Sequence, residues 1–363
     1  MRKFIIFESM SLIEFFFKLT HWESWHYHVK YIPIAPVWLW YCARARSFWF
    51  FTASNPSLTY GGFEGEGKKE MYDQLPPRSY PKSVFISTTS SFSSVKELLE
   101  SHHFSFPFVV KPDVGSMGLM FRKVNSEKQL KRYHKRMHTN YLVQELIEYP
   151  LEVSVFYYRM PDAEKGTVSG FLLKQQPEVI GDGKSTLFQL IKKNKDLKYK
   201  LDEINARHRE RLDMILPDGE KFILSHASNR SQGGKLINLA HEIDDKLVSL
   251  FDSISRHTKY FYYGRYDIKC SSIEDLKNGS RFSILEYNGA GAGIQHVYGS
   301  GLTLWQACAT ILQHWKILYR ISIHNNKKNK IPYWGHQRGR KFLKSAMQNL
   351  ALLEKLDKNF PVS

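Results

Sequence analysis

Two short runs of alternating residues organise this chain: Tyr263-Gly-Arg-Tyr-Asp-Ile-Lys269 and Phe282-Ser-Ile-Leu-Glu-Tyr-Asn288. Side chains two residues apart in a β-strand point to the same face, so Arg265 joins Asp267 on the first run and Glu286 joins Asn288 on the second. Three oxygen ligands and one cation would then share a surface. Hard oxygen donors suit Mg²⁺, which keeps several waters and is usually completed by substrate phosphates. The two runs therefore predict a metal site and, elsewhere in the chain, a nucleotide site.

Length and composition narrow the class of protein. At 363 residues the chain can bury a substantial core, and two or three subdomains are expected. Its formal net charge of +17 favours anionic partners such as nucleotides, nucleic acid or an acidic membrane surface. The Lys and Arg residues are spread along the chain without a recognition-helix or zinc motif. Specific nucleic-acid binding is therefore not expected.

Cysteine usage and the N-terminus point to the cytoplasm. Cys42, Cys270 and Cys308 are odd in number and widely spaced, so we expect reduced thiols in a cytoplasmic protein. Glu8 and Glu14 interrupt the first apolar stretch, which argues against a signal peptide and against export.

The first 60 residues are unusually aromatic. Tyr31-Ile-Pro-Ile-Ala-Pro-Val-Trp-Leu-Trp-Tyr41 is followed by Arg44 and Arg46, and the segment is too short and too rich in proline to predict a spanning helix. Aromatic and basic residues together suit the headgroup region of a membrane, so a peripheral, membrane-associated element is one interpretation. The other is an aromatic helix that packs on the next domain.

A phosphate-binding arrangement is predicted further along the chain. The strand Phe106-Pro-Phe-Val-Val-Lys-Pro112 enters the glycine-bearing loop 113–118, whose backbone amides can approach phosphate oxygens while Lys111 adds charge. Upstream, the glycine-rich run 61–67 precedes a helix that opens at Lys68. That run is interpreted either as a substrate contact or as a turn between subdomains.

Alternating and amphipathic patterns predict the remaining framework. Strands are expected over 83–86, 119–124, 141–147 and 152–157, and helices over 93–100, 126–138, 244–258, 303–322 and 342–356. The segment around Gly183-Lys-Ser185 looks like a P-loop, but Glu178 stands where that motif needs its first glycine. A P-loop is therefore excluded, and an ordinary helix-entry turn is one alternative for 181–183.

Several of these motifs together resemble the ATP-grasp superfamily. The resemblance rests on Val109-Val-Lys-Pro112, the Gly115-Ser-x-Gly118 loop, Val143-Gln-Glu-Leu-Ile147 and the Asp267 and Glu-x-Asn set, in that order. Within the superfamily the chain is most similar to D-alanine:D-alanine ligase-like and cyanophycin-synthetase-like carboxylate-amine ligases. The Gly181-Asp-Gly183 segment and Asn229-Arg-Ser-Gln-Gly-Gly234 favour the second group.

The resemblance implies an α+β chain with an ATP-grasp fold, in which two α+β subdomains clamp ATP. It covers roughly residues 80 to 315. The expected organisation is an aromatic N-terminal region at 1–80, a small subdomain at 81–158, a large subdomain at 159–323 and a basic helical tail at 324–363. The first 80 residues match the D-alanine ligase pattern poorly, so cell-wall dipeptide synthesis is not predicted.

The resemblance also implies roles for individual residues. The nucleotide would be held by a phosphate lysine, a lid, an adenine hinge, a ribose carboxylate and a second phosphate lysine: Lys111; Gly115, Ser116 and Gly118; Glu145 and Leu146; Glu152; and Lys174. Mg²⁺ or Mn²⁺ would be held by Asp267, Glu286 and Asn288, and Arg265 would steady the transferring phosphate. Substrate would face Asn229, Arg230, Ser231 and Gly291.

The implied reaction is amide formation between a small-molecule or peptide-like carboxylate and an amine, through an acylphosphate made with ATP. No His or Cys nucleophile is required. Two alternatives remain open from the sequence: an ATP-grasp kinase that stops at the phosphorylated product, and a non-catalytic nucleotide-binding or membrane-surface protein.

Overall fold

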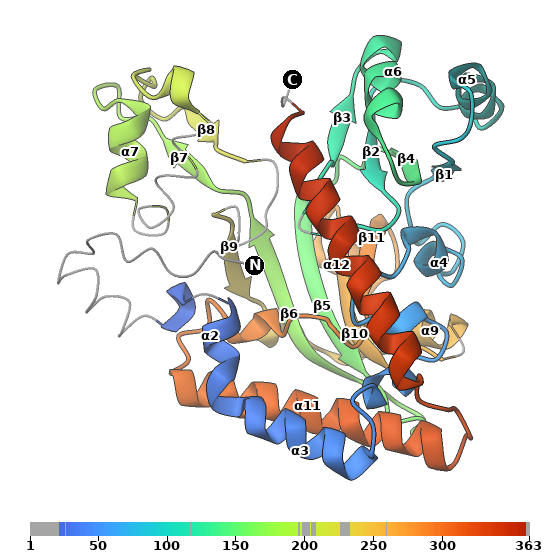
Figure 1. Cartoon of the computed structure of the whole chain (residues 1–363). Coiled ribbons are helices and arrows are strands. Elements are labelled where there is room, and N and C mark those ends of the chain that lie inside the picture. Colours follow the sequence, from blue (N-terminus) through green and yellow to red (C-terminus); the bar gives the residue numbers. More distant parts are fainter. Residues whose placement is uncertain are drawn as a thin grey trace.

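A computed structural model describes residues 22–25, 27–116, 118–194, 197, 204, 208–225, 233–258 and 260–360. Over these ranges the chain is α+β, as the sequence predicts, with two antiparallel sheets and a small two-stranded one. Figure 1 shows the two larger sheets side by side, with helices packed around them. In the described ranges, no helix is both long enough and apolar enough to cross a membrane.

The smaller of the two main sheets contains the predicted phosphate strand. Its strand order is β1-β4-β2-β3, with every neighbouring pair antiparallel. The strands and the two helices that follow β1 and β3 are β1 (Ser83–Ile86), β4 (Tyr141–Glu145), β2 (Phe108–Pro112), β3 (Arg122–Val124), α5 (Phe92–Ser101) and α6 (Glu127–Arg136). Ser91 and Ser126 cap α5 and α6 by accepting a backbone N–H, which is why each helix begins where it does.

The larger sheet has five strands in the order β11-β10-β5-β6-β9. These are β11 (Phe282–Asn288), β10 (Tyr263–Cys270), β5 (Leu151–Tyr158), β6 (Thr167–Gln175) and β9 (Lys235–Asn238). One face packs on α9 (Asp245–His257), whose Phe251 is completely buried. The other face packs on α11 (Leu304–Lys327) through residues such as Phe156 and Tyr263.

The remaining elements are short, apart from two helices. The two-stranded sheet and the other helices are β7 (Glu178–Ile180), β8 (Lys221–Ile223), α2 (Tyr27–Tyr31), α3 (Ala35–Ala45), α4 (Lys68–Tyr72), α7 (Leu187–Lys193), α10 (Ile273–Lys277) and α12 (His336–Lys358). Single 3-10 turns lie at Trp22–Ser24, Ile32–Ile34, Phe50–Ala53, Thr59–Gly62, Arg209–Arg211, Ala240–Glu242 and Gln295–Val297.

The described part of the aromatic N-terminal segment, from Trp22 onward, is part of the fold. Trp38 of α3 lies edge-on to Trp315 of α11 at 5.2 Å between ring centroids, and Tyr41 stacks on Tyr319 at 4.5 Å. Phe50, just after the helix, is completely buried. Such ring pairs add to the free energy gained from apolar burial. The inner face of α3 therefore agrees with the interpretation of an aromatic helix packed on the next domain.

Two histidines lie together beneath the larger sheet, His314 buried and His296 half-buried. The rings of His296 and His314 lie 5.0 Å apart, and His314 is only 3% exposed. Burial lowers the pKa of His314 to about 3, assisted by the neighbouring His296, and burial lowers the pKa of His296 to about 4. Both rings are therefore neutral in the folded protein at mildly acidic pH.

This pair predicts a loss of stability in acid. An unfolded histidine titrates near pH 6.5, so below that pH the unfolded chain binds protons that the folded one does not. Above about pH 6.5, His314 does not make the free energy of unfolding depend on pH. Below that pH, it lowers the free energy of unfolding by up to roughly 1.4 kcal/mol per pH unit as the pH falls toward its folded pKa. Melting temperatures between about pH 7.5 and about pH 5 should fall less steeply for His314→Gln than for the wild-type chain. The exposed His102, changed to Gln, serves as the control, and an unchanged slope for His314→Gln would contradict the prediction.

Candidate active site

The two runs that organise the sequence form neighbouring strands, β10 and β11. Their antiparallel register places Asp267 opposite Glu286 and Arg265 opposite Asn288. Ser154 of β5 lies opposite Asp267 on its other side. Since directly opposed residues share a face, the four side chains and Ser154 line one patch of the sheet.

Asp267 is the centre of this patch. Its Oδ1 lies 2.8 Å from Lys174 Nζ and accepts hydrogen bonds from Ser154 Oγ at 2.9 Å and Arg265 Nε at 3.2 Å. Its Oδ2 accepts from Arg265 Nη2 at 3.1 Å. Burial opposes ionisation, but Arg265 and Lys174 outweigh it and hold the pKa of Asp267 well below its usual range. This carboxylate is therefore charged at all physiological pH values.

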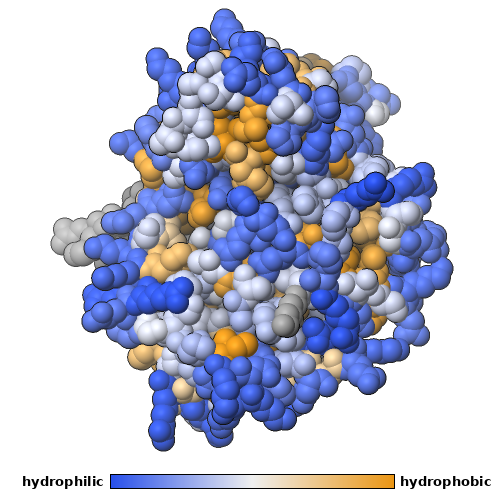
Figure 2. Space-filling model, turned by 90° about the vertical axis from the view of Figure 1, so that its right-hand side faces the viewer, coloured by the Kyte–Doolittle hydropathy of each residue, from blue (hydrophilic) through white to orange (hydrophobic). Residues whose placement is uncertain are grey.

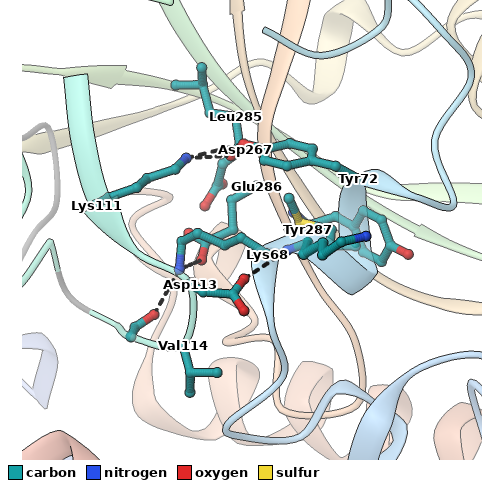
Figure 3. A network of polar contacts seen from close by, with 12 residues as sticks. Lys68, Tyr72, Lys111, Asp113, Val114, Asp267, Leu285, Glu286 and Tyr287 are labelled. Carbon is teal, nitrogen blue, oxygen red and sulfur yellow. Dashed lines mark hydrogen bonds and ion pairs between the residues drawn. The ribbon is translucent and has the colours of Figure 1, made fainter. Parts of the chain in front are cut away.

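A β-bulge connects the patch to the smaller sheet. The register of β10 and β11 shifts between Asp267 and Ile268, where Leu285 is the extra residue. The Leu285 carbonyl accepts hydrogen bonds from Tyr72 OH at 2.6 Å and from Lys111 Nζ at 3.2 Å. Figure 3 shows Lys111 reaching from its strand toward Leu285, with Asp267 and Glu286 beside it. Lys111 is 8% exposed, and burial lowers its pKa to about 8, with Glu286 acting in the opposite direction.

A lysine that the sequence analysis did not select lies between the lid and the metal patch. Lys68 Nζ donates to Gly115 O at 3.0 Å and lies 3.6 Å from Glu286 Oε1. Its backbone N–H donates to Asp113 O at 3.0 Å, which holds the start of α4 against the lid (Figure 3). The signal available in the sequence was its place directly after a glycine-rich run. Lys68 joins Lys111 as a second cation contributed from outside the larger sheet.

The glycine-rich run forms a wall of the site. Gly61 O and Gly62 O accept hydrogen bonds from the N–H groups of Ala290 and Gly291, each at 3.0 Å. A Cβ on Gly291 would lie 1.8 Å from Phe63 O, so only glycine allows this approach. The Gly291 amide, predicted to face substrate, thus donates to the glycine-rich run instead.

Carboxylates accumulate beside Glu286. Burial, and then the nearby charges of Glu286 and Glu64, raise the pKa of Glu66 to about 7. Burial and then Glu286 also raise the pKa of Glu64. Glu66 Oε2 is buried and has no hydrogen-bond partner in the part of the chain that the structure describes. This side of the site is therefore short of positive charge.

The other predicted nucleotide and substrate residues lie on β4, on β5, in the lid loop or outside the residues that the structure describes. Glu145 ends β4, where it is exposed and its N–H donates to Lys82 O, and Leu146 follows it. Glu152 on β5 lies 3.7 Å from Lys174. The lid loop contains Gly115, Ser116 and Gly118, the last with φ +74° and open space around it. Asn229, Arg230 and Ser231 lie outside the described residues.

The C-terminal helix α12 lies against the lid. Asn349 Nδ2 donates to Val114 O at 3.1 Å, and Asp357 Oδ1 accepts from Met120 N–H at 2.7 Å. Asp357 also pairs with Arg122 at 2.9 Å. Leu353 is completely buried in the core of the smaller sheet. Figure 1 shows α12 lying across the front of the molecule, beside both sheets.

The patch fits a divalent cation in its chemistry. No group of three or more His, Cys, Asp and Glu is close enough to hold a metal within the described ranges, and the predicted set contains only two carboxylates and one amide. All three offer hard oxygen atoms, as Mg²⁺ prefers. Asn288 Nδ2 is buried and lacks a hydrogen-bond partner among the described residues, so this amide is not fixed by the protein alone.

The chain resembles several solved structures over part of its length. No family model and no curated protein matches the chain. A bifunctional glutathione synthetase from Pasteurella multocida is 18% identical over 68% of this chain and 34% of its own, with a TM-score of 0.38. A D-Ala:D-Ser ligase from Enterococcus faecalis is 16% identical over 66% of this chain and 57% of its own, with a TM-score of 0.37. A D-alanine-D-alanine ligase from Coxiella burnetii is 12% identical over 80% and 64%, with a TM-score of 0.39.

The chain therefore spans about a third of the glutathione synthetase and less than two thirds of either ligase.

The nucleotide site predicted from the sequence can be tested at Lys68, whose replacement should weaken the binding of ATP, whereas replacement of its neighbour Lys69 should not. Lys68→Met removes charge-assisted contacts worth roughly 1.5–3 kcal/mol, so ATP should bind roughly 10-fold more weakly or worse. Lys69→Met is the matched control, because Lys69 is exposed and pairs with Asp73 at 2.6 Å. Isothermal titration with ATP and Mg²⁺ measures both affinities. Equal affinities for the two variants would contradict a role for Lys68 in the site.

Removing the Asp357 carboxylate should release the lid. Asp357→Ala leaves the buried Met120 N–H and Arg122 without this acceptor. The loss should lower the free energy that holds the lid in place by about 1–3 kcal/mol. Hydrogen exchange at 118–124 should become faster. Glu354→Ala, on the exposed side of the same helix, should leave the exchange rate unchanged. Unaltered exchange in Asp357→Ala would show that α12 does not restrain the lid.

Proposed function

We propose that this protein is an ATP-dependent carboxylate-amine ligase of the ATP-grasp type. The observation that carries the proposal is the register of β10 and β11, which places Asp267 opposite Glu286 and Arg265 opposite Asn288. Beside that patch lies Lys111, which the other main sheet contributes. A metal-binding carboxylate pair facing a phosphate lysine across two sheets suits a nucleotide triphosphate bound between them.

The charges in the cleft suit this substrate. Four cations reach the site from α4, the smaller sheet and the larger sheet: Lys68, Lys111, Lys174 and Arg265. The three lysines are at least nine-tenths buried, and the side chain of Arg265 is 11% exposed. Buried cations attract phosphate more strongly than exposed ones, because little water screens them. Their hydrogen bonds to Gly115 O, Leu285 O and Asp267 fix their positions before the nucleotide arrives.

The proposed reaction has two steps. A substrate carboxylate oxygen attacks the γ-phosphorus of ATP, the bond between that phosphorus and the β,γ-bridging oxygen breaks, and ADP leaves. An amine nitrogen then attacks the acyl carbon of the acylphosphate, phosphate leaves with its bonding electrons, and the nitrogen loses a proton. Phosphoryl transfer needs positioning and charge stabilisation more than covalent chemistry from side chains.

Individual residues would share that work. Lys111 and Lys68 would neutralise phosphate oxygens, and Arg265 would offset the charge that develops on the transferring group. Asp267, Glu286 and Asn288 would hold Mg²⁺, or Mn²⁺, which would supply positive charge to neutralise the phosphate oxygens. Glu152 and the hinge at Glu145 and Leu146 would position the nucleoside.

One feature favours an amine as the second substrate. Glu64 and Glu66 lie near Glu286, and the pKa of the half-buried Glu66 is raised to about 7 by burial and then by these neighbours. A substrate ammonium group would relieve this excess of carboxylates. A carboxylate with such a pKa could also accept the proton that the attacking amine must lose at neutral pH.

The first test is Mg²⁺-dependent release of ADP from ATP by the purified chain, screened with pooled carboxylates and pooled amines. Release that requires one carboxylate and one amine, with an amide found by mass spectrometry, is the expected result. A stable phosphorylated product formed without an amine would indicate a kinase. ATP binding without turnover in any pool would favour the non-catalytic alternative.

Glu286→Gln should abolish turnover and leave the fold intact, because the change removes a metal-binding charge without altering the size of the side chain. ADP release should fall at least about 100-fold, while the melting temperature stays close to that of the wild-type chain. Glu274→Gln, an exposed substitution on α10, is the control. A Glu286→Gln variant with normal turnover would exclude the metal assignment.

A further inference from the structure

The outer face of α3 is apolar and exposed. Ile32, just before the helix, is 67% exposed, and Leu39 and Trp40 are 58% and 52% exposed. Pro36 and Ala43 are exposed as well, and these positions recur at the spacing of one helix face. Tyr41 and Cys42, on the inner face, are buried. A helix that is apolar on all sides normally has both sides covered.

Large apolar side chains continue beyond α3. Phe48, which follows the helix, is 60% exposed, and Trp305 at the start of the adjacent α11 is 74% exposed. Single exposed apolar residues are common, but a row of them along one helix requires an explanation. By comparison, the side of the molecule that carries α4 and α9 is mostly hydrophilic, with small separate apolar patches (Figure 2).

The layer formed by α3 and α11 is built from stretches of chain that contain basic residues but no acidic ones. No acidic residue occurs from 24 to 63 or from 287 to 353, the two stretches that supply these helices. Arg44 lies over the ring of Trp40 at 5.0 Å, which joins the basic and aromatic parts of the surface. Exposed basic residues of this layer are Arg44, Arg46, Lys316, Arg320, Lys327, Lys328 and Lys330.

We propose that this face, which we call the α3 face, binds the surface of an anionic lipid bilayer. It comprises Ile32, Leu39, Trp40 and Phe48 with Arg44 and Arg46. Tryptophan and phenylalanine insert favourably at the depth of the headgroups, and arginine pairs with anionic lipids. At 11 residues, α3 can lie along the surface but is too short to cross it.

Other occupants fit the face less well. A second copy of the chain would bring two such layers together, and the stretches that form α3 and α11 contain no acidic residue to offset the basic ones. Nucleic acid would use the arginines but would leave the row of aliphatic and aromatic side chains in water. A bilayer with acidic headgroups satisfies both the charge and the apolar row. This inference does not depend on the proposed ligase activity.

The experiment is co-sedimentation of the full chain with vesicles of phosphatidylcholine, alone or mixed with phosphatidylserine. The wild-type protein should bind the mixed vesicles and bind neutral ones at least about 10-fold more weakly. Leu39→Ser combined with Trp40→Ser should reduce binding to mixed vesicles by about 10-fold or more. Arg44→Gln combined with Arg46→Gln should reduce it by a few-fold and weaken its dependence on salt.

Matched controls lie elsewhere on the molecule. Met347→Ser removes another exposed apolar residue, on α12, and Lys221→Gln removes another exposed cation, on β8; neither should alter vesicle binding. Equal melting temperatures show that the variants fold. Equal binding of neutral and acidic vesicles, or unchanged binding by Leu39→Ser with Trp40→Ser, would overturn the proposal. Concentration-dependent dimerisation that this double variant abolishes, without vesicle binding, would assign the face to a second copy instead.

Discussion

The buried carboxylate of Asp267 is the constraint on which the cleft depends. A charged group that is 8% exposed is costly unless cations and hydrogen-bond donors surround it. The partners are Arg265 of β10, Lys174 of β6 and Ser154 of β5. The pairing of these three strands and the ionisation of Asp267 therefore require each other. A shift of register by one residue would turn Asp267 into the apolar core and leave both cations without a partner.

Buried cations with oxygen partners also connect the two main sheets. Lys111 belongs to β2, yet its hydrogen-bond partners are Tyr72 of α4 and the Leu285 carbonyl that the bulge in β11 releases from the regular ladder. Lys68 similarly joins the lid to Glu286. The two sheets, which also share an apolar cluster through Leu142 of β4, are thus connected by buried cations that bind carbonyl and carboxylate oxygens. Phosphate oxygens are ligands of the same kind, so the interactions that hold the cleft together are also suited to bind a nucleotide.

Local patterns in the sequence predicted the frame of the cleft well, because strand alternation and helix capping act over a few residues. The strand at 83–86 is found as predicted, and Ser126, expected at the start of its helix, is the residue that caps it. The sequence could not predict the contacts of Lys68, since a lysine after glycines looks the same in any helix-entry turn. Nor could it predict that the Gly291 amide is occupied by Gly62 O, because that contact joins residues far apart in the chain. The aromatic composition of α3 predicts that one face of this helix is packed against the protein. It does not predict that the packing partner is α11.

The parts of the cleft that the family resemblance leaves out are the ones most able to set specificity. Strands that carry Lys111, Asp267 and Glu286 lie within residues 80 to 315, but the wall at 61–67 and the helix α12 do not. The wall contributes Lys68's neighbours Glu64 and Glu66, and α12 restrains the lid through Asn349 and Asp357. In the proposed ligase, nucleotide chemistry would constrain the shared strands strongly, because the ligand atoms of ATP and its cation are the same in every such enzyme. The flanking segments would meet the second substrate and the lid, so they would be free to differ between ligases. This difference accounts for a sequence in which the phosphate-binding motifs can be found while the substrates cannot.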